Sequence, residues 1–207
     1  PHLSLLYGNF DESIKKKIIA KLGKINFKLR IESLYLTNSS IETKPKNWQA
    51  IAEFPFGVVD SLKKGKIGVI PTDTIYGIVG SALNPKTVEK IYKLRKRSLD
   101  KPMIILTSSL NDLNHFNIKL TEKQVKFLEK IWPNPVSVIL LVVGEKFKYL
   151  HRGTNSLAFR IPKDVWLRKL LDEVGSLVAP SANFEGEKPA ETVTEAKKYF
   201  GDKVDFY

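Results

Sequence analysis

The stretch KIGVIPTDTIYG, residues 66–77, indicates the fold class of the larger part of the chain. Its first five residues have the pattern of a strand, which runs directly into Pro71-Thr72-Asp73-Thr74. Ligand sites in α/β folds favour the carboxyl ends of strands, so the two threonine hydroxyls are candidates to hold a small polar substrate. Pro, Asp and Gly are equally typical of a plain turn, and the local residues do not decide between these interpretations.

Helix and strand patterns alternate on both sides of this stretch, from about residue 56 to the C-terminus. Helices are predicted at 58–64, after Asn84-Pro85, after a capping box at Thr121 and Gln124, at 164–174, and after a second box at Thr192 and Glu195. Strands are predicted at 66–70, 78–82, 103–107, 137–143, 156–161 and 177–179, and the strand at 137–143 is expected to be buried. This order predicts an α/β domain with a mixed sheet.

The first 55 residues have a different pattern, which predicts a small α+β segment. We expect strands at 3–7 and 27–31, a helix at 11–22, a polar loop at 37–47 and a short strand at 48–54. A segment of this length buries only a limited core. We therefore expect two parts, residues 1–55 and 56–207.

The composition favours anionic partners and excludes several kinds of site. There are 34 Lys and Arg residues against 22 Asp and Glu, a formal net charge of +12. This excess suits nucleotides or RNA, although runs such as Lys15-Lys16-Lys17 are also typical of a solvated helix face. The absence of cysteine removes disulfides and thiolate chemistry and fits a reducing compartment. We expect a cytoplasmic protein with no membrane segment, since no apolar run is long enough to cross a bilayer.

A basic cluster closes the helix predicted after Pro85. It comprises Lys93, Arg95, Lys96, Arg97 and Lys101. Residues 93, 96 and 97 are predicted to share one helix face, with Arg95 pointing elsewhere. Guanidinium groups bind phosphate oxygens with paired donors, which makes the cluster a candidate phosphate clamp. Cations at a helix C-terminus are also favoured by the helix dipole alone.

Two other strands carry polar side chains that are candidates for a site. Ser181 and Asn183 follow the strand at 177–179 and could donate to phosphate or ribose oxygens, although a plain polar connection explains them equally well. Arg160 lies in an apolar strand, where a cation needs a partner. Glycine-rich P-loop and dinucleotide fingerprints are absent, and no activated nucleophile is evident.

Five motifs, in this order, resemble those of the YrdC-like threonylcarbamoyl-AMP synthase family. They are PTDTIYG (71–77), RKRSLDKP (95–102), WPNPVS (132–137), LAFR (157–160) and PSAN (180–183). The resemblance covers about residues 56–207 and implies a twisted mixed sheet with flanking helices and a basic concave surface. It also implies synthesis of threonylcarbamoyl-AMP and pyrophosphate from L-threonine, bicarbonate and ATP, for threonylcarbamoylation of adenosine 37 in tRNA.

The same resemblance implies the site residues and partners. Arg95 and Arg97 would be catalytic. ATP would contact Arg97, Lys101, Ser137, Ala158, Ser181 and Asn183, and L-threonine would contact Thr72, Thr74, Ser156 and Arg160. Mg²⁺ would accompany ATP, with no organic cofactor and with metal ligands unknown. The implied partners are tRNA or double-stranded RNA and the tRNA threonylcarbamoyl transferase machinery.

Three departures from the family pattern bear on activity. Arg95 stands where the family usually has Lys, and Asn134 stands where it usually has Gly. The chain also ends before a Gly- and Ser/Thr-rich segment that members normally carry, so we expect the nucleotide-binding domain to be incomplete at its C-terminus. The alternative is therefore a non-catalytic tRNA- or nucleotide-binding module of the same fold.

The N-terminal residues resemble part of a different family. PHLSLLYG (1–8) is similar to one of the two His-x-Ser/Thr motifs of the two-histidine cyclic phosphodiesterases, and residues 48–54 resemble the C-terminal end of that family. The resemblance implies a phosphodiesterase half-site at His2 and Ser4. Neither His115 nor His151 begins a second motif, so cyclic phosphodiesterase activity is the least favoured alternative.

Overall fold

The computed structural model of the protein describes residues 33–38, 49–55, 57–142 and 144–207, with side chains described from residue 57 onward. The chain divides into two units, residues 1–32 and 33–207, and all described residues belong to the second. The elements predicted before residue 33, and the half-site residues His2 and Ser4, lie outside the described residues. The predicted boundary between residues 55 and 56 stays a prediction.

Strands β1 (Ser33–Asn38) and β2 (Gln49–Pro55) form an antiparallel pair. β2 confirms the strand predicted at 48–54. The sequence does not predict β1, and Thr37 and Asn38, expected to open a polar loop, instead pair with Ala50 and Gln49. Threonine is β-branched and fits a strand well, so a polar side chain at residue 37 does not prevent pairing.

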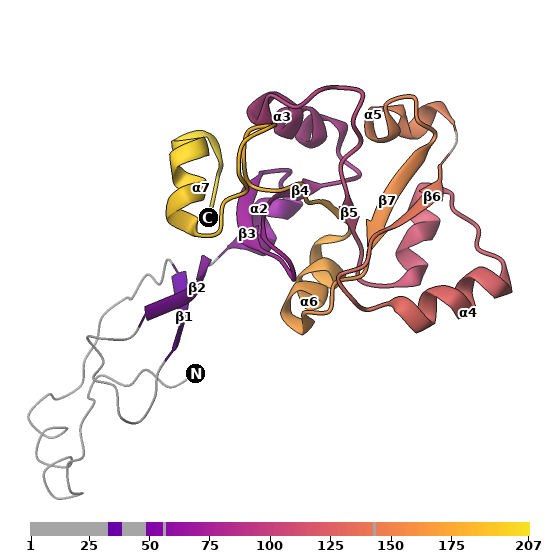
Figure 1. Ribbon diagram of the computed structural model, residues 1–207, viewed down its shortest axis with the longest axis horizontal. Helices are drawn as coiled ribbons and strands as arrows, with labels where there is room; N and C mark the ends of the chain where they lie inside the picture. The colour runs from indigo at the N-terminus through magenta and orange to yellow at the C-terminus, as the bar shows by residue number, and fades with distance from the viewer. Residues whose placement is uncertain (1–32, 39–48, 56, 143) are drawn as a thin grey trace, which may run out of the picture. The chain divides into compact units, whose positions relative to one another are not determined.

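A six-stranded mixed sheet forms the centre of residues 57–207, with the strand order β3-β4-β8-β5-β7-β6 (Figure 1). β5 and β7 run parallel, and every other neighbouring pair is antiparallel. The mixed α/β sheet predicted from the sequence is therefore confirmed. The strands are β3 (Gly68–Pro71), β4 (Tyr76–Ser81), β5 (Ile105–Leu106), β6 (Val138–Leu141), β7 (Ser156–Arg160) and β8 (Leu177–Val178).

Helices flank this sheet, and none of those described is long and apolar enough to cross a membrane. The α-helices are α2 (Val58–Lys63), α3 (Pro85–Arg95), α4 (Glu122–Ile131), α5 (Lys148–His151), α6 (Val165–Val174) and α7 (Val193–Phe200). Three short 3₁₀ segments, η2 (Leu110–Phe116), η3 (Glu145–Phe147) and η4 (Gly201–Lys203), connect them.

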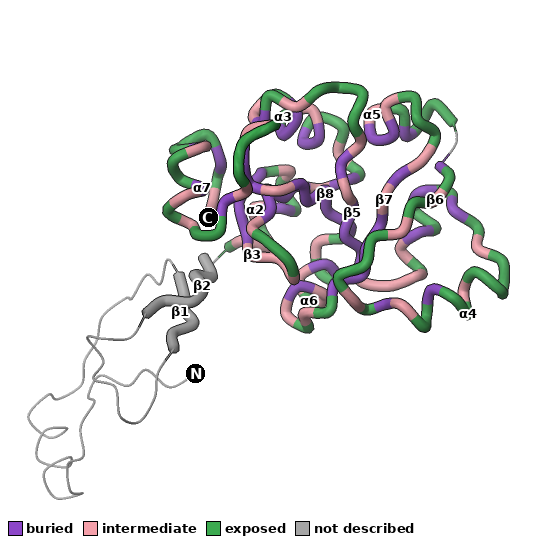
Figure 2. The backbone as a smooth tube through the Cα atoms, in the orientation of Figure 1, coloured by how far each residue is buried: buried purple, intermediate pink, exposed green. Residues whose placement is uncertain are grey.

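The apolar core lies on both faces of the sheet, because successive strand residues point to opposite sides. On one face, Leu106 and Leu177 pack with α2 and α6. On the other, Ile105 and Val178 pack with residues of α3, α4, α5 and α7. Figure 2 shows this as buried chain along β8, β5 and β7, with exposed turns around them. Two packed faces hold the central strands rigidly, and their ends carry the loops described below.

Local hydrogen bonds fix where helices begin. Asn84 caps α3 and Pro85 occupies its first position, as predicted, and the capping box predicted before α4 is also present. The prediction for α7 is half right. Thr192 accepts from the N–H of Glu195, but the Glu195 carboxylate accepts from Glu191 instead of from Thr192, because the glutamate side chain reaches one residue further back.

Strand β6 corrects the expectation of a buried strand at 137–143. Ile139 and Leu141 are 72% and 77% exposed, whereas Val138 and Leu140 pack against the core. β6 is the last strand in the sheet order, and its alternating side chains contact the core from one face only. An apolar run therefore does not establish burial at a sheet edge.

Candidate active site

Two of the predicted polar turns lie side by side. The N–H of Ala182 donates to the carbonyl of Tyr76 at 2.8 Å, and Gly77 pairs with Ser181 in an isolated bridge. A side chain at Gly77 would place its Cβ 3.2 Å from the methyl carbon of Thr72, a tight contact within the first turn, and 3.5 Å from the carbonyl oxygen of Pro180, an ordinary van der Waals distance. Glycine at this position thus relieves crowding with Thr72, while the backbone contacts hold the two turns together.

The two threonines of the first turn have different roles. Thr72 Oγ1 donates to the carbonyl of Ile75 at 2.6 Å and accepts from the N–H of Thr74 at 3.3 Å, so this hydroxyl closes the turn. Thr74 is exposed, and its Oγ1 lies 3.4 Å from Nη2 of Arg160. The turn interpretation therefore describes Thr72, and Thr74 offers the hydroxyl that faces solvent.

Arg160 has the partner that its place in an apolar strand requires. Its Nη2 lies 3.0 Å from Oδ1 of Asp73, and the two side chains are 9% and 3% exposed. Asp73 also accepts from the N–H of Lys163 at 3.3 Å. Burial lowers the pKa of Arg160, and the carboxylate of Asp73 opposes that shift. This ion pair ties the turn at residues 72–75 to the end of β7.

Arg95 joins the end of α3 to the second turn. It is 2% exposed, and its Nε donates to the carbonyl of Asn183 at 3.0 Å. Its Nη2 lies 3.2 Å from Oγ of Ser181 and 3.3 Å from Oδ1 of Asn183. Burial, followed by repulsion from Arg97, lowers the pKa of Arg95 to about 10. The group remains charged at neutral pH, and its buried Nη1 has no hydrogen-bond partner, so the two N–H groups of this nitrogen are left for an anion.

The rest of the basic cluster is arranged differently from the prediction. α3 ends at Arg95, and Lys96 adopts a left-handed conformation with φ of 51°, so residues 93, 96 and 97 do not share a helix face. Arg97 donates to the carbonyls of Lys101 and Pro102, both at 3.0 Å. Lys101 forms an ion pair of 2.8 Å with Glu185. Residues 96–102 therefore form a loop and not a helix face, and hydrogen bonds from the Arg97 guanidinium group hold this loop in place.

These contacts form one continuous set that suits binding of an anion next to a small polar molecule. The set contains two buried guanidinium groups, a lysine and several hydroxyls. Within the part of the chain that the structure describes, no serine or threonine hydroxyl is hydrogen-bonded to a histidine ring. The arrangement therefore favours positioning and charge neutralisation over a covalent nucleophile.

Comparison with known proteins identifies the family. Residues 60–207 match the Sua5/YciO/YrdC family model, which carries the description "Telomere recombination". The chain belongs to the Sua5/YciO/YrdC family. The resemblance to the YrdC-like family is thereby confirmed, and the resemblance of the N-terminal segment to cyclic phosphodiesterases stays a prediction.

Two relatives in the Sua5/YciO/YrdC family are named as threonylcarbamoyl-AMP synthases. A threonylcarbamoyl-AMP synthase of Photobacterium profundum is 28% identical, over 71% of this chain and 81% of its own. A putative threonylcarbamoyl-AMP synthase of Methanocaldococcus jannaschii is 31% identical over 72% of each chain.

Two solved structures show the same fold. Pyrococcus abyssi Sua5 complexed with L-threonine has a TM-score of 0.65 and 26% identity, covering 72% of this chain and 44% of the Sua5 chain. Escherichia coli YciO has a TM-score of 0.62 and 18% identity, covering 72% and 73%. This chain thus spans less than half the length of the Pyrococcus abyssi Sua5 chain.

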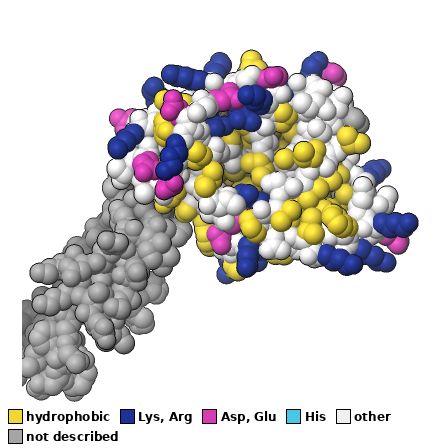
Figure 3. All heavy atoms as spheres, in the orientation of Figure 1, with side chains coloured by type: hydrophobic (Ala, Val, Ile, Leu, Met, Phe, Trp, Pro, Cys, Tyr) yellow, Lys and Arg dark blue, Asp and Glu magenta, His cyan; other side chains and the backbone are white. Residues whose placement is uncertain are grey.

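The remaining residues predicted for nucleotide and threonine lie along β6 and β7. Ser156, Ala158 and Arg160 alternate in β7 and so point to one face, the face on which Ile139 and Leu141 are exposed across the strand pair. Ser137 is exposed and directly precedes β6. Ser156 lies at the opposite end of β7 from Arg160, so the structure places these residues along an open face and not around one point. Figure 3 shows hydrophobic side chains gathered over the middle of one face of the molecule, with Lys and Arg around them.

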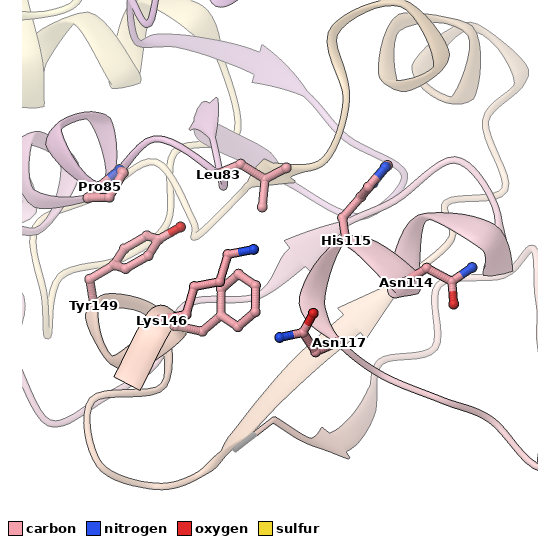
Figure 4. Close-up of a pocket in the computed structure, with 8 residues that line it drawn as sticks. Leu83, Pro85, Asn114, His115, Asn117, Lys146 and Tyr149 are labelled. Atoms are coloured by element: carbon pink, nitrogen blue, oxygen red, sulfur yellow. The ribbon is translucent and has the colours of Figure 1, made fainter. Parts of the chain in front are cut away.

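A separate hollow of about 490 Å³ lies away from these residues (Figure 4). Leu83, Phe147, Tyr149 and Lys146 line it, and His115 lies on its wall. The Tyr149 hydroxyl is already bonded to the carbonyl of Ala82 at 2.9 Å. None of the predicted site residues of this Sua5/YciO/YrdC chain lines this hollow.

The described residues do not form a ready metal site. No group of three or more His, Asp or Glu side chains converges within the described ranges. Three carboxylates of the site already have partners: Asp73 with Arg160 and Lys163, Glu185 with Lys101 and the N–H of Ser98, and Asp100 with the Ser98 hydroxyl. The residues present therefore do not fit a protein-held Mg²⁺, and we assign no step to one.

Two site residues have no clear signal in the sequence. Glu185 contacts the basic loop 84 residues earlier in the chain through Lys101, a separation that no local pattern reveals. Thr107 is fully buried with an unpaired Oγ1, and its N–H donates to the carbonyl of Arg160 at 3.0 Å. Its place at the end of an apolar strand is the one signal that could have indicated it.

Proposed function

We propose that the protein is an L-threonylcarbamoyladenylate synthase, which forms threonylcarbamoyl-AMP and pyrophosphate from L-threonine, bicarbonate and ATP. The observation that carries the proposal is the hydrogen bonding of buried Arg95 to Ser181 and Asn183. The turn that holds these two residues also pairs, through Ser181 and Gly77, with the end of the residue 71–76 turn, which contains Thr72 and Thr74. Named threonylcarbamoyl-AMP synthases among the relatives support it.

The reaction requires positioning of charged groups. The amine of threonine and bicarbonate form a carbamate with loss of water. A carbamate oxygen attacks the α-phosphorus of ATP, a new P–O bond forms, and the bond to the β-phosphate oxygen breaks to release pyrophosphate. The unpaired Nη1 of Arg95 and the side chains of Arg97 and Lys101 would neutralise the phosphate charge. Ser181 would orient Arg95 by accepting from it, and its own O–H would donate a hydrogen bond to the same ligand.

The amino-acid end of the site lies at the first turn. The exposed Thr74 hydroxyl and the unpaired Nε of Arg160 would contact the carboxylate and hydroxyl of threonine, while Thr72 holds the turn in shape. The structure of Pyrococcus abyssi Sua5 complexed with L-threonine supports this choice of amino acid. Asp73 would act by holding Arg160.

The nucleotide would lie across the open face of β6 and β7. Ser137 and Ala158 present a hydroxyl and a small side chain there, next to exposed apolar residues that suit a base. Ser156, predicted for threonine, lies at the opposite end of β7 from Arg160. Mg²⁺ would arrive bound to the ATP phosphates, since no set of described carboxylates holds it. Aqueous cytoplasm supplies all three substrates, and we place the protein there.

RNA is the second partner that a specific observation favours. Lys90, Lys93, Lys96 and Lys203 surround Phe184 and Leu94 in a groove of about 600 Å³. Lys90 is paired with Asp205, and the other three lysines have no acidic partner among the described residues. A basic groove with an aromatic ring suits a nucleic acid. It supports RNA, tRNA included, as a partner, and non-catalytic RNA binding as the alternative function.

Pyrophosphate release, with each substrate omitted in turn, tests the proposal. Release should require threonine, bicarbonate and ATP together. Lys101→Met should weaken it about tenfold, as expected for loss of one charge-assisted phosphate contact. Lys130→Met on α4 removes another exposed lysine charge, away from the site, and should leave release unchanged. Salt-dependent RNA binding with no release under any condition would favour the non-catalytic alternative.

A further inference from the structure

The carboxylate of Glu185 binds the two groups of the loop after α3 that could otherwise bind an external anion, the Lys101 ammonium and the Ser98 N–H. One oxygen forms the 2.8 Å ion pair with the Lys101 ammonium, and the other accepts from the backbone N–H of Ser98. The backbone N–H of Glu185 donates to the carbonyl of Arg95 at 3.0 Å. The carboxylate therefore sits at the same loop that carries Arg97 and Lys101, beside the buried Arg95.

An ammonium group and a backbone N–H that converge on two oxygens of one anion are also the donors that a phosphate group takes. We infer that Glu185 is a built-in competitor, which fills the phosphate-binding position of Lys101 and Ser98 and is displaced when a phosphate enters. The inference rests on the proposed function for the identity of that phosphate as part of ATP.

The exposure of the two side chains fits an exchangeable contact. The Lys101 side chain is 58% exposed and that of Glu185 is 24% exposed. Neither is locked in the core, and a surface ion pair of this kind is weak enough to be exchanged for a doubly charged phosphate. The backbone bond from Glu185 to Arg95 does not involve the carboxylate, so the loop keeps an anchor when the side chain leaves.

Binding of inorganic pyrophosphate, measured by titration calorimetry, tests the inference without requiring catalysis. Glu185→Ala should bind pyrophosphate about three- to fivefold more tightly than the natural chain, because the ammonium is released from its internal partner. Glu185→Gln should show part of this gain, since it removes the charge and keeps an acceptor for Ser98. The gain should disappear in a variant that combines Glu185→Ala with Lys101→Met.

Glu191→Ala is the matched control, because it removes the same charge and breaks a 2.9 Å ion pair with Lys188 on the same segment. If Glu191→Ala increases the affinity for pyrophosphate as much as Glu185→Ala does, the increase comes from net charge alone and the inference is overturned. Unchanged or weaker binding in Glu185→Ala, or no pyrophosphate binding by any form, would overturn it too. Failure of the proposed function would appear separately, as ATP turnover that does not depend on threonine.

Discussion

Removal of the Asp73 carboxylate should destabilise the folded protein more than any exposed charge does. In Asp73→Ala, the guanidinium of Arg160, 7% exposed as a residue, keeps only the Thr74 hydroxyl at 3.4 Å as a side-chain partner. Breaking a buried ion pair by removing one member costs about 3–5 kcal/mol. Because Arg160 lies at a strand end near solvent, we expect about 3 kcal/mol, a fall in Tm of about 6–12 °C for a domain of this size.

The combination of Asp73→Ala with Arg160→Met distinguishes an ion pair from simple loss of packing. Once both charges are absent, no uncompensated charge is buried, so the double variant should recover about 1–2 kcal/mol relative to Asp73→Ala. Urea and thermal unfolding, followed by circular dichroism, measure both quantities. Asp172→Ala, at an exposed position of α6, is the control. A loss below about 1 kcal/mol in Asp73→Ala, or strictly additive single effects, would refute the reasoning.

Three other substitutions have expected outcomes. Arg95→Met removes both the charge and the fork that contacts Ser181 and Asn183, so kcat/KM should fall about 100-fold while the fold is retained; near-normal kcat/KM would remove Arg95 from the site. Hydrogen bonds from Lys101 and the Ser98 N–H lower the pKa of Glu185 below 4.5, so its stabilisation is present above pH 4.5 and is lost as the pH falls through the lowered pKa. The urea midpoint of the natural chain should therefore exceed that of Glu185→Gln at pH 6, and the difference should shrink as the pH falls below 4.5. A difference that stays constant over this range would contradict the prediction. Gly80→Ala would place Cβ 2.4 Å from Thr87 and 3.0 Å from Ile67, which should cost about 1–3 kcal/mol of unfolding free energy; an unchanged urea midpoint would show that α3 moves freely away from β4.

Patterns that depend on local chemistry were predictable. The caps at Asn84 and before α4, the strand and helix order, and the mixed sheet follow from periodicity and turn residues, because these act over a few residues. The need of Arg160 for a partner was also predictable, because a cation in an apolar strand cannot remain unpaired. Its identity, Asp73, was not, since the pair joins positions 87 residues apart.

Features that depend on tertiary contacts were beyond reach. The Arg95 side chain at the end of α3 bonds to a turn 88 residues later, and no helical pattern in residues 93–97 contains that information. β6 is apolar but exposed on one face, because what covers a strand depends on its place in the sheet order. From the sequence, Glu185 is indistinguishable from any other charged loop residue, because its contact with Lys101 joins positions 84 residues apart.

The most direct test of the central claim is detection of the product itself. The protein is incubated with ATP, L-threonine and ¹³C-labelled bicarbonate, and the reaction is analysed by mass spectrometry. We expect threonylcarbamoyl-AMP carrying one labelled carbon, formed together with pyrophosphate and absent when threonine is omitted. ATP binding without any labelled adduct would contradict the account and leave the chain as a nucleotide-binding module.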